Sequence, residues 1–217
     1  MITVDETHRV SGLLQAARGA RACYLLAHGA GSGMTHPFMA GIADGLAERG
    51  VATLRYQFPY MEQGGKRPDP PKLAQATVRA AVAEASSLAP KLPLVAGGKS
   101  FGGRMTSQAQ AESPLPGVRG LAFLGFPLHA AGRQSEERAA HLFEVKIPML
   151  FLQGTRDALA DIALMGKLVA NLGKRATLVT IADGDHSFRL PTRTGRSDED
   201  VRVEMLDAFA AWIEGLS

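Results

Sequence analysis

The sequence lacks the features typical of secreted and membrane-spanning proteins. Its only cysteine is Cys23, so no internal disulfide can form, and a reducing cytoplasm is the compartment we expect. No apolar run approaches the roughly 18 residues that a membrane helix needs. The first six residues carry acid without a basic and then apolar pattern, so we expect no signal peptide. These absences predict a cytoplasmic protein that makes no membrane contact.

A concentrated charge of one sign is also missing. Lys and Arg number 24 against 21 Asp and Glu, which leaves a net charge of +3. The basic residues occur in small groups, such as Lys66 with Arg67 and Arg193 with Arg196, and acids lie nearby. A nucleic-acid binder concentrates its basic residues in a stripe, so no nucleic-acid partner is expected. The chain has no H-E-x-x-H motif and no cysteine cluster, so we expect no metal and no cofactor.

What the sequence does contain is a regular alternation of apolar runs and helical periodicity. With 217 residues, 46% of them hydrophobic and 21% charged, the chain is long enough to build its own core. Strands are expected at 22–27, 51–56, 92–97, 121–126, 147–152 and 176–181. Helices are expected at 37–49, 71–88, 102–111, 160–172 and 198–216. An antiparallel pair, 2–4 with about 9–16, should lie at the edge.

Continuous apolar runs are typical of strands that are buried on both faces, and their alternation with helices predicts parallel crossover units. The sequence therefore predicts the α/β class: a single domain over residues 1–217, with a mostly parallel central sheet flanked by helices.

A serine follows the third of these core strands on a glycine-rich turn. Residues Gly98, Ser100 and Gly102 match the pattern G-x-S-x-G, which occurs often enough by chance that its context must decide. A nucleophile elbow needs a strand before it and a helix after it, and both are predicted here. The alternative is a glycine-rich turn with an idle serine. A phosphate-binding P-loop is disfavoured, because Pro93 stands where that motif needs glycine.

A serine nucleophile needs a base and an acid that orients the base, and later strands supply candidates for both. Asp157 follows the expected strand 147–152, and His186 follows 176–181. The carboxyl ends of parallel strands meet at one edge, where ligands bind. Asp183 and Asp185 compete for the role of the acid, and Asp157 could instead cap the next helix. We favour Ser100, His186 and Asp157 as the catalytic residues.

The first core strand ends in a second glycine-rich segment, from His28 to Gly33. An acyl-transfer intermediate needs backbone N–H donors aimed at its developing oxyanion. We expect these from Ala30 and from Phe101, the residue after the nucleophile. His28 is interpreted as a brace for this loop. A dinucleotide fingerprint fails, because the third glycine it needs is replaced by Met34.

Together these motifs resemble the α/β-hydrolase superfamily, and in particular small lidless hydrolases related to dienelactone hydrolase. The resemblance spans about residues 9–215, although dienelactone hydrolase itself uses a cysteine where this chain has Ser100. Larger relatives insert a helical cap where this chain has only residues 127–146, so we expect no large cap and an open site.

The residues and the resemblance imply a serine hydrolase that cleaves small carboxylic esters through an acyl-enzyme. A thioesterase or peptidase using the same residues, or an interaction protein on a hydrolase scaffold, remains open. The oligomeric state and the physiological substrate are not predicted. An apolar pocket is expected from side chains near the catalytic edge, with core packing as the alternative for them. These are Met34, Phe38, Tyr60, Met61, Phe126, His129 and Phe188.

Overall fold

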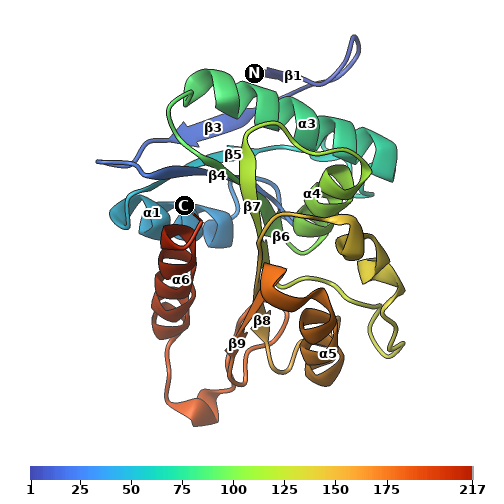
Figure 1. Cartoon of the computed structure of the whole chain (residues 1–217), viewed down its shortest axis with the longest axis vertical. Helices are drawn as coiled ribbons and strands as arrows, with labels where there is room; N and C mark the ends of the chain where they lie inside the picture. The colour runs from blue at the N-terminus through green and yellow to red at the C-terminus, as the bar shows by residue number, and fades with distance from the viewer. Residues whose placement is uncertain (217) are drawn as a thin grey trace.

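A seven-stranded sheet forms the centre of the computed structural model, which describes residues 1–216 (Figure 1). Six of the strands run parallel, and only the edge strand β3 is antiparallel to its neighbour. In spatial order the strands are β3 (Gly12–Gln15), β5 (Val51–Tyr56), β4 (Ala22–Ala27), β6 (Leu94–Lys99), β7 (Val118–Leu124), β8 (Met149–Gly154) and β9 (Ala176–Ile181). The expected α/β fold with a mostly parallel sheet is confirmed.

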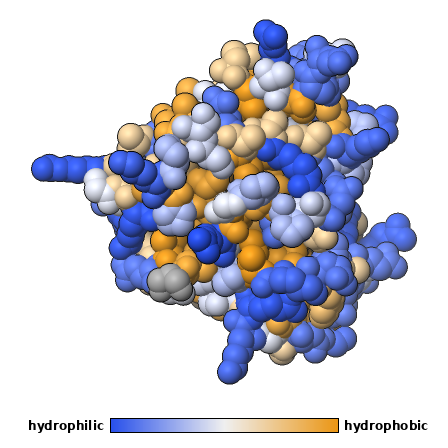
Figure 2. All heavy atoms as spheres, turned by 45° about the horizontal axis from the view of Figure 1, so that its top comes forward, coloured by the Kyte–Doolittle hydropathy of each residue, from blue (hydrophilic) through white to orange (hydrophobic). Residues whose placement is uncertain are grey.

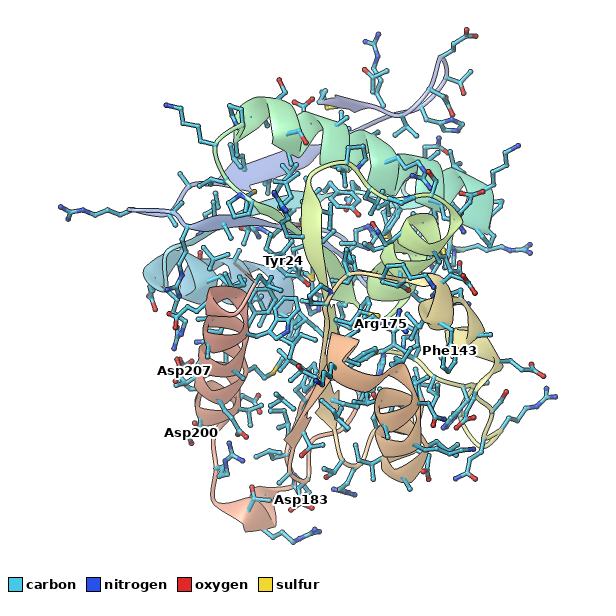
Figure 3. All side chains as sticks on the ribbon, viewed as in Figure 1. Tyr24, Phe143, Arg175, Asp183, Asp200 and Asp207 are labelled. Carbon is cyan, nitrogen blue, oxygen red and sulfur yellow. The ribbon has the colours of Figure 1, made fainter. Side chains whose placement is uncertain are left out.

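Helices cover both faces of the sheet, which explains why its strands are apolar throughout (Figure 1). On one face α1 (Pro37–Glu48) packs beside α6 (Asp198–Glu214). On the other face lie α3 (Pro71–Leu88), α4 (Phe101–Glu112) and α5 (Ile162–Leu172). Successive side chains of β4 alternate between the two cores: Tyr24 contacts Phe209 of α6, whereas Leu25 joins the core beneath α3. Tyr24 is labelled in the middle of the molecule in Figure 3.

Most of the expected boundaries agree with the structure to within about three residues. The strands 22–27, 51–56 and 176–181 and the helix 71–88 have the predicted bounds. Strand β6 begins at Leu94 rather than at 92, because Pro93 has no N–H to donate to the sheet. The stretch expected to be a loop after β5 contains one helical turn, α2 (Pro59–Glu62). The remaining short elements are η1 (Glu137–Glu144), η2 (Gly173–Arg175) and η3 (Thr192–Thr194).

The prediction for the first sixteen residues was wrong in one respect. The segment expected as a single strand over 9–16 is divided at Ser11. Strand β2 (Arg9–Val10) pairs with β1 (Ile2–Thr3), whereas β3 pairs with β5 in the main sheet. At the break, the backbone N–H of Ser11 donates to the carboxylate of Glu62 at 2.8 Å instead of to a neighbouring strand.

The surface is of mixed character. Figure 2 shows hydrophilic side chains projecting around the face that it presents, with hydrophobic residues between them. None of the helices within residues 1–216 combines the length and the apolar character needed to cross a bilayer.

Candidate active site

The turn from β6 into α4 holds Ser100 in a backbone conformation that side chains rarely adopt. Its φ is 48° and its ψ −112°, and the helix begins at the next residue. The turn packs tightly against the end of β4. A Cβ on Gly98 would lie 2.1 Å from the carbonyl oxygen of Ala27, and one on Gly102 would lie 2.5 Å from that of His28. Glycine is therefore required at both positions if the strained serine is to project from the sheet.

The carboxyl edge of the sheet brings together the three residues singled out from the sequence. Oγ of Ser100 lies 2.8 Å from Nε2 of His186, and Nδ1 of His186 lies 2.6 Å from Oδ2 of Asp157. They follow β6, β9 and β8; β8 and β9 are neighbours, and β7 lies between β6 and β8. The side chain of Asp157 is fully buried, whereas 24% of the His186 side chain is exposed. A carboxylate can only accept, so Nδ1–H donates to Asp157, and Nε2 is left to accept the Ser100 proton.

The carboxylate of Asp157 is held by two further donors. The side-chain amide of Gln153 donates to Oδ2 at 2.5 Å, and the backbone N–H of Leu159 donates to Oδ1 at 2.7 Å. Gln153 is anchored in turn, because its Oε1 accepts from the N–H of Phe126 at 2.9 Å. Sequence reasoning missed Gln153, although a glutamine at the end of a buried apolar strand signals a need for internal hydrogen bonds.

Asp183 and Asp185, the alternative candidates for the acid, make contacts with other residues than His186. Asp183 forms an ion pair with Arg193 and lies at the rim of the molecule, where Figure 3 labels it. Asp185 accepts from backbone N–H groups of its own loop, those of Ser187 and Arg189. The cap of α5 is Asp161 rather than Asp157.

The loop after β4, which carries Ala30, is held by its neighbours. His28 is buried, and its Nε2 accepts from the N–H of Phe58 while its Nδ1 lies 2.8 Å from the carbonyl oxygen of Gly29. Burial lowers the pKa of His28 to about 4, so the ring is neutral and acts as a brace. Within residues 1–216, the N–H groups of Ala30 and Phe101 have no hydrogen-bond acceptor. Neither N–H is therefore committed to another group of the described chain, and their role as oxyanion donors stays a prediction.

A pocket of about 640 Å³ opens beside Ser100 and His186, between α1 and α6. Much of its lining is apolar or aromatic. Phe38 and Phe188 contribute parallel rings whose centroids are 6.0 Å apart. The α6 residues in the lining, Val201 and Met205 among them, could not be found from the sequence, because nothing in it pairs α6 with α1.

Five of the seven residues expected around the pocket lie outside its lining. Tyr60, Met61 and Phe126 join the core beneath α3, α4 and α5, whereas the pocket opens on the α1 and α6 side. Tyr60 also accepts a hydrogen bond from the N–H of Gly31. Nε2 of His129 accepts from the N–H of Asp161, and the buried Met34 donates its N–H to Gln57. Packing and loop support thus account for these five side chains.

Within residues 1–216, no group of three or more His, Cys, Asp or Glu side chains is arranged to hold a metal ion.

Comparison with known proteins places the chain among others of the same architecture. The family model described as an alpha/beta hydrolase domain matches residues 20–214. The structure of dienelactone hydrolase from Anabaena variabilis superposes with a TM-score of 0.78 at 22% identity, over 99% of this chain and 94% of that one. A lidless α/β serine hydrolase from Xanthomonas campestris gives a TM-score of 0.75 at 20% identity, over 98% and 93%. Est1E from Butyrivibrio proteoclasticus, with ferulic acid bound, gives 0.68 at 18% identity, over 93% and 96%.

Proposed function

Because this chain belongs to the alpha/beta hydrolase domain family, we propose that it is a serine hydrolase that cleaves small carboxylic esters. The observation that supports this most strongly is the continuous hydrogen-bonded chain from Ser100 through His186 to Asp157, with contacts of 2.8 and 2.6 Å. A serine hydroxyl is a weak nucleophile until a base accepts its proton, and this geometry supplies that base together with the acid that orients it.

In the proposed reaction, Oγ of Ser100 attacks the ester carbonyl carbon as Nε2 of His186 takes the hydroxyl proton. The buried carboxylate of Asp157 stabilises the imidazolium that forms. The N–H groups of Ala30 and Phe101 donate to the oxyanion of the tetrahedral intermediate. His186 then gives its proton to the departing alkoxide, which leaves an acyl-enzyme. A water molecule then gives a proton to the same imidazole and attacks the acyl carbon. His186 returns that proton to Oγ of Ser100 as the acyl–oxygen bond breaks, which releases the acid and restores the enzyme.

The pocket between α1 and α6 suggests the substrate class within this proposal. An apolar lining favours an acyl or alkyl chain of short to medium length. Between β7 and β8 the chain has only the helical turns of η1. We infer from this short connection that the substrates are small soluble esters.

The test is the variant Ser100→Ala, assayed with a short p-nitrophenyl ester and with a fluorophosphonate probe. We expect turnover and labelling to be lost while circular dichroism stays unchanged, because the methyl group removes only the nucleophile. Ser107→Ala is the matched control: Ser107 also contacts a histidine, at 2.7 Å from Nε2 of His141, but it is fully buried and outside the pocket.

Retained turnover in Ser100→Ala would identify a different nucleophile. A native protein that neither turns over esters, thioesters or amides nor takes up the probe would instead favour an interaction protein on this scaffold.

A further inference from the structure

Lys99, the residue before Ser100, directs its side chain into the site rather than into solvent. Its Nζ donates to the backbone carbonyl oxygen of His186 at 2.5 Å. The ammonium group also lies 5.3 Å from the centre of the Phe188 ring. One side chain thus joins the nucleophile strand β6 to the loop that carries the proposed base.

Two glycines, Gly29 and Gly125, border the side chain of Lys99. A Cβ on Gly29 would lie 3.3 Å from Cγ of Lys99, and a Cβ on Gly125 would lie 2.9 Å from its Nζ. The Cβ on Gly125 would also lie 3.6 Å from Cε1 of His186, so the ammonium of Lys99 and the imidazole of His186 lie close together. A side chain at either glycine would crowd the lysine away from the histidine.

We propose that Lys99 is a positioning residue for His186: it holds the histidine loop against β6 through the carbonyl of His186. The proposal rests on the proposed hydrolase function. The chemistry requires a base that is aligned with Oγ of Ser100. A tether on the main chain of His186 supplies this alignment.

Two carboxylates, those of Asp157 and Asp185, help to keep the side chain of Lys99 charged. Burial lowers the pKa of Lys99 to about 8, and the two carboxylates oppose this shift. The side chain is therefore mainly cationic at neutral pH. A hydrogen bond from a charged donor is stronger than one from a neutral donor, so the ammonium of Lys99 holds the carbonyl of His186 more firmly than a neutral group would.

The test compares Lys99→Met, which keeps the length of the apolar stem, with Lys99→Arg, which keeps the charge. For Lys99→Met we expect kcat to fall about 10²-fold, the effect of misplacing a reacting group by about 1 Å, with KM changed less than about twofold. Lys99→Arg should restore part of kcat, because it keeps a charged donor for the carbonyl of His186.

Lys146→Met is the matched control. Lys146 also donates to a backbone carbonyl, that of Phe143 at 3.0 Å, but it is exposed on the surface outside the pocket. Lys146→Met should leave kcat and KM unchanged. Thermal unfolding of all three variants establishes that the comparison is made between folded proteins.

Three results would overturn the proposal: native kcat in Lys99→Met, a rise in KM alone, which would indicate a substrate contact, or an unmoved Cε1–H resonance of His186 in Lys99→Met. The last is read by NMR. This measurement needs no substrate, so it tests Lys99 even if the native protein hydrolyses nothing. Inactivity of the native protein would count against the proposed function alone.

Discussion

The nucleophile turn (residues 97–103) and the histidine loop (residues 182–189) meet at one site but are held in different ways. In the nucleophile turn, backbone packs against backbone, and an added Cβ on Gly98 or Gly102 would approach a carbonyl oxygen to 2.1 or 2.5 Å. In the histidine loop, side chains provide the contacts: Asp157 and Lys99 bind His186, and Asp185 caps the following turn.

The difference separates two kinds of sensitivity. Backbone packed against backbone cannot accommodate an added methyl group, because a protein interior has little free volume. Polar side-chain contacts can be weakened one at a time while the fold persists. Changes in the nucleophile turn should therefore reduce stability, whereas changes around the histidine loop should reduce activity. The following substitutions test this contrast, beginning with the largest expected effect.

Asp157→Asn should lower kcat about 10⁴-fold, the cost of holding a catalytic histidine in the wrong tautomer. The amide has nearly the shape of the carboxylate and keeps an oxygen for the N–H of Leu159, but its NH2 group would face the donating amide of Gln153. The free energy of unfolding should therefore fall by only about 1 kcal/mol. Asp183→Asn is the control, since Asp183 pairs with Arg193 at the rim. Steady-state kinetics measure kcat, and urea unfolding measures stability. A comparable loss of kcat in Asp183→Asn, or a large loss of stability in Asp157→Asn, would contradict the difference proposed between the two regions.

Gly98→Ala should destabilise the protein by about 3 kcal/mol or more, because overpacking and backbone strain act together. The φ of Gly98 is 140°, outside the range that suits alanine. Gly166→Ala in α5 is the matched control. A Cβ at Gly166 would meet no atom within 4 Å, so this change should be neutral or stabilising by up to about 1 kcal/mol. Urea unfolding followed by circular dichroism measures both, and equal midpoints would show that the turn is not sterically fixed.

Phe38→Ala should have the smallest effect, and it should appear in substrate choice. Loss of the ring beside Phe188 should lower kcat/KM about fivefold for a p-nitrophenyl hexanoate relative to the acetate, which corresponds to about 1 kcal/mol of aromatic contact. Phe143→Ala is the control, because Phe143 is partly exposed on η1, on the opposite side of the molecule from α6 in Figure 3. A flat chain-length profile in the native protein would argue against an acyl chain in this pocket.

The sequence alone was enough to predict the fold and the contacts that depend on strand order. Its apolar periodicity predicted the α/β class, and the glycines around Ser100 predicted the tight turn, because both follow from local sterics and burial. The positions of Ser100, Asp157 and His186 after separate strands brought them to one edge, since parallel strands share their carboxyl edge.

The tertiary structure decided what lies beside that edge. Tyr60 and Phe126 appeared equally suited to the pocket, yet they pack in the core of the opposite face. The pocket lining from α6, the support of Asp157 by Gln153 and the contact of Lys99 with His186 join segments that are distant or unrelated in sequence pattern. Periodicity shows that a side chain is buried, but the packing of helices on the sheet determines which neighbours it meets there.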